Sequence, residues 1–185
     1  MTEQHMIEQH MIEKHMAERF ESSRLIIRST KKADTEFCLS IWLDDEMGKY
    51  LSDPPRALAG QIYDEWQENI EIFEGCYYFV AVSKETGDRI GTCSLVPNED
   101  LTVWDLGYSV HQDYWRMGYG TEIIESLMQM SRDMGGQKIT ASVASENPGS
   151  NAVLRKLGFS VEKEGSFKKS GTDIVYEEYV YARGL

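Results

Sequence analysis

A chain of 185 residues with 41% apolar content is long enough for one globular domain with a sizeable core, and no run of about eighteen apolar residues predicts a membrane span. The 19 basic and 31 acidic residues give a net charge of −12, which disfavours nucleic acid as a partner because its phosphates carry the same sign. The acidic excess could attract a cationic amine substrate, or it could serve solubility alone. Three widely spaced cysteines fit neither full disulfide pairing nor a zinc motif, and we expect a cytoplasmic protein.

A repeat of five residues occupies positions 3–17, with two copies of Glu-Gln-His-Met-Ile followed by Glu-Lys-His-Met-Ala. A period of five advances by about 140° per copy on a helix, so the three histidines do not share a face and no metal site is expected. The repeat could be a helical arm that packs on a partner subunit and forms a homodimer, or a tail without function. We therefore divide the chain into an N-terminal arm, residues 1–22, and a domain, residues 23–185.

The first part of the domain has clear patterns of apolar side chains. Its predicted elements, in chain order, are a strand, two helices joined by a loop with two prolines, and the two strands of a hairpin: residues 24–29, 32–43, 58–73, 77–83 and 89–97. We therefore expect a domain that mixes helices with antiparallel strands.

The run from residue 103 to 134 predicts a strand, a glycine turn and a helix. Side chains alternate from Val103 to Val110, and apolar residues recur at helical spacing after Thr121. The turn between them carries two glycines and Arg116. The first N–H groups of a helix lack partners within the helix and carry the positive end of its dipole, so a phosphate would fit here. A turn without a ligand would look the same, and the third glycine of a dinucleotide fingerprint is missing, since Ile123 stands there.

A second motif follows the predicted strand at residues 138–145. The pair W-x-x-G-x-G-T-E, from Trp115, and N-x-x-S-x-x-V-L-x-K-L-G-F, from Asn147, resembles the GNAT family of acetyl-CoA-dependent N-acetyltransferases, and most closely its ribosomal-protein N-terminal acetyltransferase branch. The resemblance covers roughly residues 24–184. It implies an α+β fold, with a central mixed and mostly antiparallel sheet of about seven strands flanked by about four helices, and two last strands at about 160–169 and 174–183.

The resemblance also implies a coenzyme site. The glycine turn would bind the pyrophosphate of acetyl-CoA, and the pantetheine arm would lie beside the preceding strand. The cofactor-binding residues would be the strand end, the turn and one asparagine after it: Tyr108, Ser109, Val110, Arg116, Met117, Gly118, Tyr119, Gly120, Thr121 and Asn147. Many relatives carry Gln or Arg where this chain has Trp115, which leaves Arg116 as the only cationic side chain of the loop.

Acetyl transfer to an amine needs a neutral nucleophile, a polarised carbonyl and a proton for the departing thiolate. A backbone N–H near residues 108–110 could polarise the carbonyl. Many relatives place a tyrosine acid where this chain has Leu154, so the candidate acid is Ser150, which could instead cap a helix. The candidate base is Asp105, which could instead be a solvated strand carboxylate, and Asp173 is a weaker candidate.

In the family the two early helices and their loop form a wall of the acceptor pocket, so Trp42, Tyr50 and Trp66 are candidate substrate contacts. Helical spacing favours core packing for both tryptophans. We expect an enzyme that acetylates a primary amine, which could be a protein N-terminus, a polyamine or a small-molecule amine, without a metal. Two alternatives remain: an acyl-CoA sensor without turnover, and a scaffold that assembles through the arm.

Overall fold

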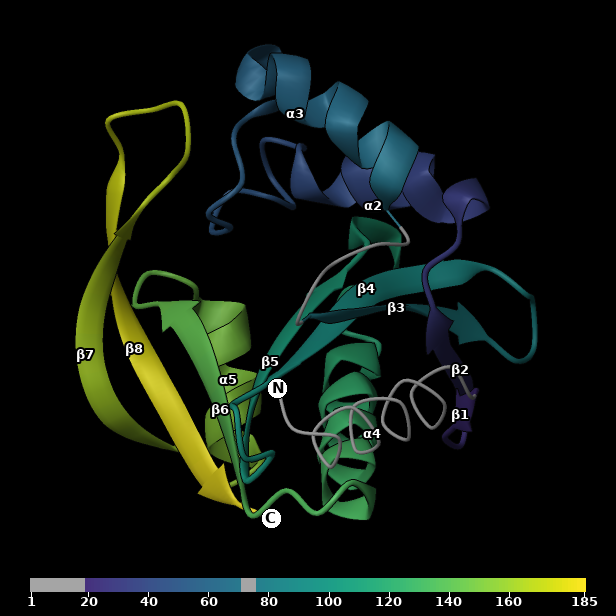
Figure 1. The fold of residues 1–185 in the computed structure, drawn as a ribbon, viewed down its shortest axis with the longest axis vertical. Coiled ribbons are helices and arrows are strands. Elements are labelled where there is room, and N and C mark those ends of the chain that lie inside the picture. Colours follow the sequence, from purple (N-terminus) through teal and green to yellow (C-terminus); the bar gives the residue numbers. More distant parts are fainter. Residues whose placement is uncertain (1–18, 71–75) are drawn as a thin grey trace.

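A computed structural model describes residues 19–70 and 76–185 of the chain (Figure 1). In this part, eight strands form one mixed sheet in the order β1-β2-β3-β4-β5-β6-β8-β7, and four α-helices flank it. The strands are β1 (Phe20–Glu21), β2 (Leu25–Ser29), β3 (Tyr77–Ser83), β4 (Arg89–Pro97), β5 (Val103–Val110), β6 (Lys138–Ala144), β7 (Ser160–Lys168) and β8 (Val175–Gly184). The expected α+β fold is therefore confirmed, with one more strand than predicted because two residues before β2 pair with it as β1.

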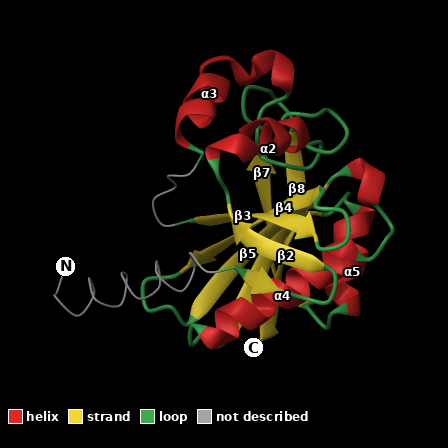
Figure 2. Ribbon diagram, turned by 90° about the vertical axis from the view of Figure 1, so that its right-hand side faces the viewer, coloured by secondary structure: helices red, strands yellow, loops and turns green. Residues whose placement is uncertain are grey.

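The four helices cover both faces of the sheet. They are α2 (Thr35–Trp42), preceded by the short 3₁₀ turn η1 (Lys32–Asp34), α3 (Arg56–Asn69), α4 (Tyr119–Asp133) and α5 (Pro148–Lys156). Figure 2 shows α2 and α3 on one side of the strands and α4 on the other. The alternation of side chains along β3 explains this: Phe79 and Ala81 belong to the core under α4, whereas Val80 belongs to the core under α2 and α3.

Most strands pair antiparallel, but β5 and β6 are parallel and soon diverge. β5 pairs with β4 along its whole length, from Gly91↔Val110 to Pro97↔Trp104. With β6 it pairs only from Val103↔Lys138 to Asp105↔Thr140, and β6 then continues beside β8. Figure 1 shows the two strands spreading apart toward their carboxyl ends. On the side that faces β6, residues 106–110 therefore present backbone groups to an opening, while on the other side they pair with β4.

Several element ends differ from the predictions for local reasons. α4 begins at Tyr119, two residues earlier than expected, because Gly118 takes the left-handed conformation and starts the helix there. α3 ends at Asn69, and Gly60 has a non-helical conformation inside it. The predicted extension of this helix to Phe73 lies outside the described residues.

The predicted arm lies almost wholly outside the part that the structure describes, so its boundary at residue 22 stays a prediction. Within residues 19–70 and 76–185, no helix combines the length and the apolar character needed to cross a membrane.

Candidate active site

The glycine turn before α4 has the geometry of an anion site. Gly118 has φ 83°, and Arg116 is a non-glycine residue with positive φ, 62°. The Trp115 indole N–H donates to the Val110 carbonyl at 2.6 Å and closes the turn against the end of β5. The N-cap residue Gly118 has no side chain that could accept a hydrogen bond from the first N–H groups of α4, so within the described residues these donors, with the positive helix end, suit an anion.

A second glycine keeps this turn close to β5. A Cβ on Gly120 would lie 3.1 Å from the ring of Tyr108, tighter than ordinary van der Waals contact. The turn residues 115–118 are exposed, while Tyr119, Gly120 and Thr121 form the half-buried first turn of the helix. Of the predicted cofactor-binding residues, the structure thus places Tyr108 and Val110 of β5 directly against the turn.

Sequence reasoning missed a cation at this turn. The Arg24 guanidinium donates from Nη1 to the Met117 carbonyl at 3.0 Å and from Nε to Glu122 at 2.7 Å. It also lies 4.3 Å above the ring of Tyr119. Arg116 is the cationic side chain of the loop itself. Arg24 supplies a second cation, which lies beside the loop. Since Arg24 and Met117 are 93 positions apart, no local pattern could have indicated the contact.

Ser150 and Asn147 lie on the other side of the opening, at the start of α5. The Asn147 side-chain oxygen accepts a hydrogen bond from the Ser150 N–H at 3.1 Å, so the helix cap is Asn147 and not Ser150. The Ser150 hydroxyl is hydrogen-bonded to the Tyr108 hydroxyl. Burial raises the pKa of Tyr108, and this hydrogen bond opposes the rise. One pair of hydroxyls thus links β5 to α5 where the strands diverge.

Asn151 fixes this turn and was also missed. Its amide nitrogen donates to the backbone carbonyls of Ala144, at 3.0 Å, and of Asn147, at 2.6 Å. Its side-chain oxygen accepts from the Tyr181 hydroxyl at 2.7 Å. Asn151 is buried, so these bonds hold the start of α5 to the end of β6 and to β8. The buried asparagine next to Ser150 is therefore a positioning residue for it.

A small cavity lies between α2, α3 and the diverging end of β5. Its volume is about 140 Å³, and the described residues that line it are Trp42, Leu51, Asp53, Trp66, Tyr78, Thr92, Cys93, Ser94, Gly107, Tyr108 and Ser109. Trp42 is only 7% exposed and donates its indole N–H to Thr92 at 3.0 Å. Trp66 packs edge-on against it, with ring centroids 5.3 Å apart. Both tryptophans therefore pack in the core and line the cavity at once.

Tyr50, the third expected substrate contact, is not among the residues lining this cavity. Its ring packs edge-on against Tyr176 of β8 at a centroid distance of 5.6 Å. The sequence pattern could not separate it from the tryptophans, because only tertiary packing decides which way the loop turns.

The two expected carboxylates occupy different surroundings. Asp105 lies at the last pair of β5 and β6, where its carboxylate accepts from the Thr140 hydroxyl at 2.6 Å. The residue is exposed overall, yet desolvation raises the pKa of its carboxyl, and the bond from Thr140 only partly opposes this. It stands at the point of divergence, outside the cavity lining. Asp173 forms an exposed ion pair with Lys168 at 3.0 Å.

A different carboxylate does line the cavity. Asp53 is half-buried in the loop before α3, and desolvation raises the pKa of its carboxyl while the charge of Lys169 opposes the rise. Sequence analysis placed it only in a proline-containing loop. A loop has no periodicity from which the direction of a side chain could be inferred.

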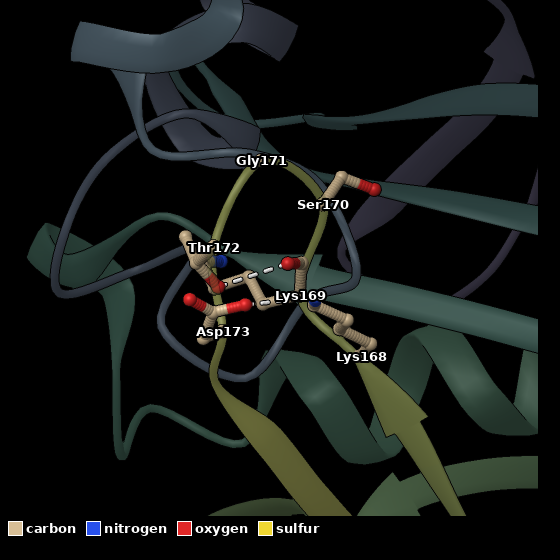
Figure 3. A pocket seen from close by; sticks show the side chains of 6 residues that line it. All are labelled: Lys168, Lys169, Ser170, Gly171, Thr172 and Asp173. Carbon is tan, nitrogen blue, oxygen red and sulfur yellow. Dashed lines mark hydrogen bonds and ion pairs between the residues drawn. The ribbon is translucent and has the colours of Figure 1, made fainter.

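A second, larger pocket does not have the converging lining of the small cavity. It has about 570 Å³ and is open to solvent, and the described residues that line it, 168–173, run from the end of β7 into the loop before β8 (Figure 3). Polar groups from one turn do not converge on a ligand. Its buried lysine serves the fold, since the Lys169 ammonium donates to the carbonyls of Gly48, at 2.8 Å, and Leu51, at 3.0 Å. Among the described residues, no group of three or more metal-binding side chains is present.

Comparison with known proteins agrees with this architecture. Residues 24–160 match the family model described as "Acetyltransferase (GNAT) domain". The Bacillus subtilis protein named "Uncharacterized N-acetyltransferase YoaA" is 25% identical over 169 residues, which cover 89% of this chain and 89% of that protein.

Two solved enzymes share the fold. The ribosomal-protein-S5-alanine acetyltransferase from Vibrio fischeri has a TM-score of 0.69 and 21% identity, over 90% of this chain and 96% of that one. The spermidine N-acetyltransferase from Vibrio cholerae, solved with CoA and spermine, has a TM-score of 0.74 and 16% identity, over 88% of this chain and 96% of that one. Their two acceptors differ, so the shared fold does not select an acceptor.

Proposed function

Because the chain belongs to the acetyltransferase (GNAT) family, we propose that it transfers the acetyl group of acetyl-CoA to a primary amine. The observation that carries this proposal is the divergence of β5 from β6 directly in front of the glycine turn. One side of that opening has the free N–H groups of α4, and the other has the small cavity. A protein N-terminus, a polyamine and a small-molecule amine are the candidate acceptors, and the ribosomal-protein branch stays a proposal.

The coenzyme side of the proposal uses backbone groups and cations. The first N–H groups of α4, together with Arg116 and Arg24, would hold the pyrophosphate. The backbone of residues 106–110 would hold the pantetheine arm as a neighbouring strand does, and Asn147 would contact the arm. Acetyl-CoA supplies the thioester whose carbonyl carbon receives the amine.

The chemical roles follow from the groups at the opening. A backbone N–H of residues 108–110 would polarise the carbonyl, because it has no strand partner on that side in the described chain. Ser150, bonded to the Tyr108 hydroxyl, would supply the proton that the departing thiolate needs. Leu154 is fully buried in the core, so this position contributes no acid. The amine must lose a proton, for which Asp105 is the carboxylate at the point of divergence.

The test is an amine panel with acetyl-CoA, in which release of the free thiol and the mass of the acetylated product are both measured. We expect turnover with at least one amine, and about a hundredfold lower kcat for Ser150→Ala. Ser160→Ala, at an exposed serine of β7, is the matched control and should keep the wild-type rate. Coenzyme binding without product from any amine would contradict the enzyme and favour the sensor alternative.

Two further parts of the proposal concern assembly through the N-terminal arm and the cellular compartment of the protein. We keep a homodimer assembled through residues 1–22 and a cytoplasmic location as proposals. Removal of residues 1–18 should convert a dimer to a monomer in light scattering, while thiol release per chain is retained. A monomeric full-length chain would contradict the assembly role.

A further inference from the structure

The small cavity is sized for one end of an acceptor. Its volume of about 140 Å³ corresponds to about five water-sized groups, since a water occupies about 30 Å³ in the liquid. The residues of β5 in its lining, Gly107 to Ser109, belong to the stretch that has left β6. A short unbranched chain that ends in nitrogen would therefore fill the cavity and bring the nitrogen to the site of transfer.

The walls of the cavity favour a cation. Four aromatic residues are in its lining, Trp42, Trp66, Tyr78 and Tyr108, and aromatic faces attract ammonium groups. Asp53 adds a carboxylate in the same lining. A cavity of this size, lined by two tryptophans, two tyrosines and one carboxylate, suits an alkylammonium ion.

Asp53 has no cation of its own within the described residues. The charge of Lys169 opposes the rise of the Asp53 pKa, but the ion pairs found within 4 Å among the described residues do not include one between these two groups. The Lys169 ammonium is occupied with the carbonyls of Gly48 and Leu51. These two bonds hold the loop that carries Asp53 against the β7–β8 hairpin, so Lys169 fixes the loop and leaves the carboxylate to a ligand.

Building on the proposed function, we propose that Asp53, which lines the cavity, takes the place of Asp105 as the base: it binds the reacting ammonium of an unbranched alkylamine and accepts its first proton. The nitrogen then bonds to the thioester carbon, and the carbon–sulfur bond breaks. The second proton leaves the nitrogen and reaches the sulfur through the Tyr108 and Ser150 hydroxyls. The proton on Asp53 passes to solvent, so the cycle releases one amide, one thiol and one proton.

This assignment predicts a substrate class. A carboxylate beside the amine would be repelled by Asp53 and would need room that about five water volumes do not offer. Free α-amino acids are therefore poor acceptors, and the acceptor presents an alkylammonium end with no acidic group near the nitrogen. Among the candidates, a linear polyamine fits this description.

The binding step can be tested without turnover. Two of the four tryptophans of the chain line the cavity, so fluorescence titration reports a ligand there. The probes are n-butylamine, which is protonated at pH 7, and n-butanol, which has the same chain without charge. We expect saturable binding of the amine alone by the wild type, and about tenfold weaker binding by Asp53→Asn.

Asp45→Asn is the matched control, because Asp45 is an exposed carboxylate of the same loop whose charge also acts on Lys169. It should bind n-butylamine as the wild type does. Equal affinity of the wild type for n-butylamine and n-butanol would overturn the inference even if Asp53→Asn did not fold. Equal affinity of wild type and a folded Asp53→Asn would overturn it as well.

Turnover gives the second arm of the test. With an amine accepted in the panel, Asp53→Asn should lower kcat/KM by about a hundredfold or more, and Asp45→Asn should not. Full activity of Asp53→Asn overturns the inference and leaves the proposed function intact. Failure of every amine to yield product contradicts the proposed function, while the fluorescence titration still decides whether Asp53 binds ammonium.

Discussion

At the scale of single residues, Arg24 joins the N-terminal edge of the sheet to the coenzyme turn. Its guanidinium bridges the Met117 carbonyl and the Glu122 carboxylate. Burial opposes ionisation of Glu122, but hydrogen bonds from Ser22 and from Arg24 outweigh it and lower the pKa of this carboxyl. The carboxylate thus stays charged near neutral pH and anchors Arg24 beside the turn.

We predict that Arg24→Gln weakens the affinity for coenzyme A about tenfold, because both a cation and a support of the turn are lost. Isothermal titration of CoA measures this. Arg132→Gln, at an exposed arginine near the other end of α4, removes the same charge and should leave the affinity nearly unchanged. Equal weakening in both variants would show that only the net charge of the protein matters.

Glu122→Gln separates the two contributions of Arg24. If Arg24 acts by supporting the turn, loss of its anchor weakens CoA binding too. If it acts by its charge alone, removal of a neighbouring negative charge strengthens binding.

At the scale of elements, a buried cluster attaches α2 to the sheet. Asp34, in η1, is fully buried and forms ion pairs with Arg28 of β2 and Arg89 of β4, both at 2.6 Å. Burial opposes ionisation of this carboxyl, but the hydrogen bonds from both arginines and from the Lys31 backbone outweigh it and lower the pKa of Asp34 to about 2. The cluster thereby holds α2, whose last residue Trp42 lines the small cavity, against the sheet.

We predict that Asp34→Asn lowers the free energy of unfolding by about 3 kcal/mol at pH 7, because two arginines lose their partner. The pKa of Asp34 is lower in the folded state than in the unfolded state, so its stabilisation is present above about pH 4 and is lost as the pH falls through about 2. Urea unfolding from pH 7 to pH 2 should show the difference between wild type and variant shrinking in that window. A difference that is independent of pH, or equal to that of the exposed control Asp133→Asn, would contradict this.

The elements themselves were largely predictable, and their contacts were not. The bounds of β3 and β4 agree with prediction residue for residue, because alternating side chains and a glycine turn define both strands locally. The glycine turn was predicted from its own residues, whereas the Asn147 segment was singled out by the resemblance to the acetyltransferase family. The contacts of Arg24, the direction of Asp53 and the packing of Tyr50 join distant parts of the chain, so no local pattern encodes them.

At the scale of the whole molecule, the acceptor cavity depends on segments from both ends of the domain. The hairpin loop between β7 and β8 reaches the loop before α3, where the Ser170 N–H donates to the Ser52 carbonyl at 2.8 Å. Lys169, buried in the same loop, spans 121 positions of sequence to reach Gly48. The last hairpin of the chain therefore shapes a cavity whose lining comes from the first helices and from β5.

The proposed coenzyme site and the proposed acceptor cavity meet where β5 leaves β6. One half of the molecule offers the positive end of α4, and the other offers a carboxylate among aromatic rings. This separation suits an anionic cosubstrate and a cationic acceptor that approach from opposite faces of the sheet. It also means that each half can be tested alone.

The most direct measurement is thermal melting with and without acetyl-CoA for the wild type, Gly118→Glu and Gly135→Glu. Both glycines have positive φ, 83° and 88°, and neither would place a Cβ in a clash, so the two substitutions cost similar backbone strain at opposite ends of α4. We predict that acetyl-CoA stabilises the wild type and Gly135→Glu by about 2.7 kcal/mol at a hundredfold excess over the dissociation constant, and leaves Gly118→Glu unchanged. Equal shifts in both variants, or no shift in the wild type, would contradict the assignment of the glycine turn as the coenzyme site.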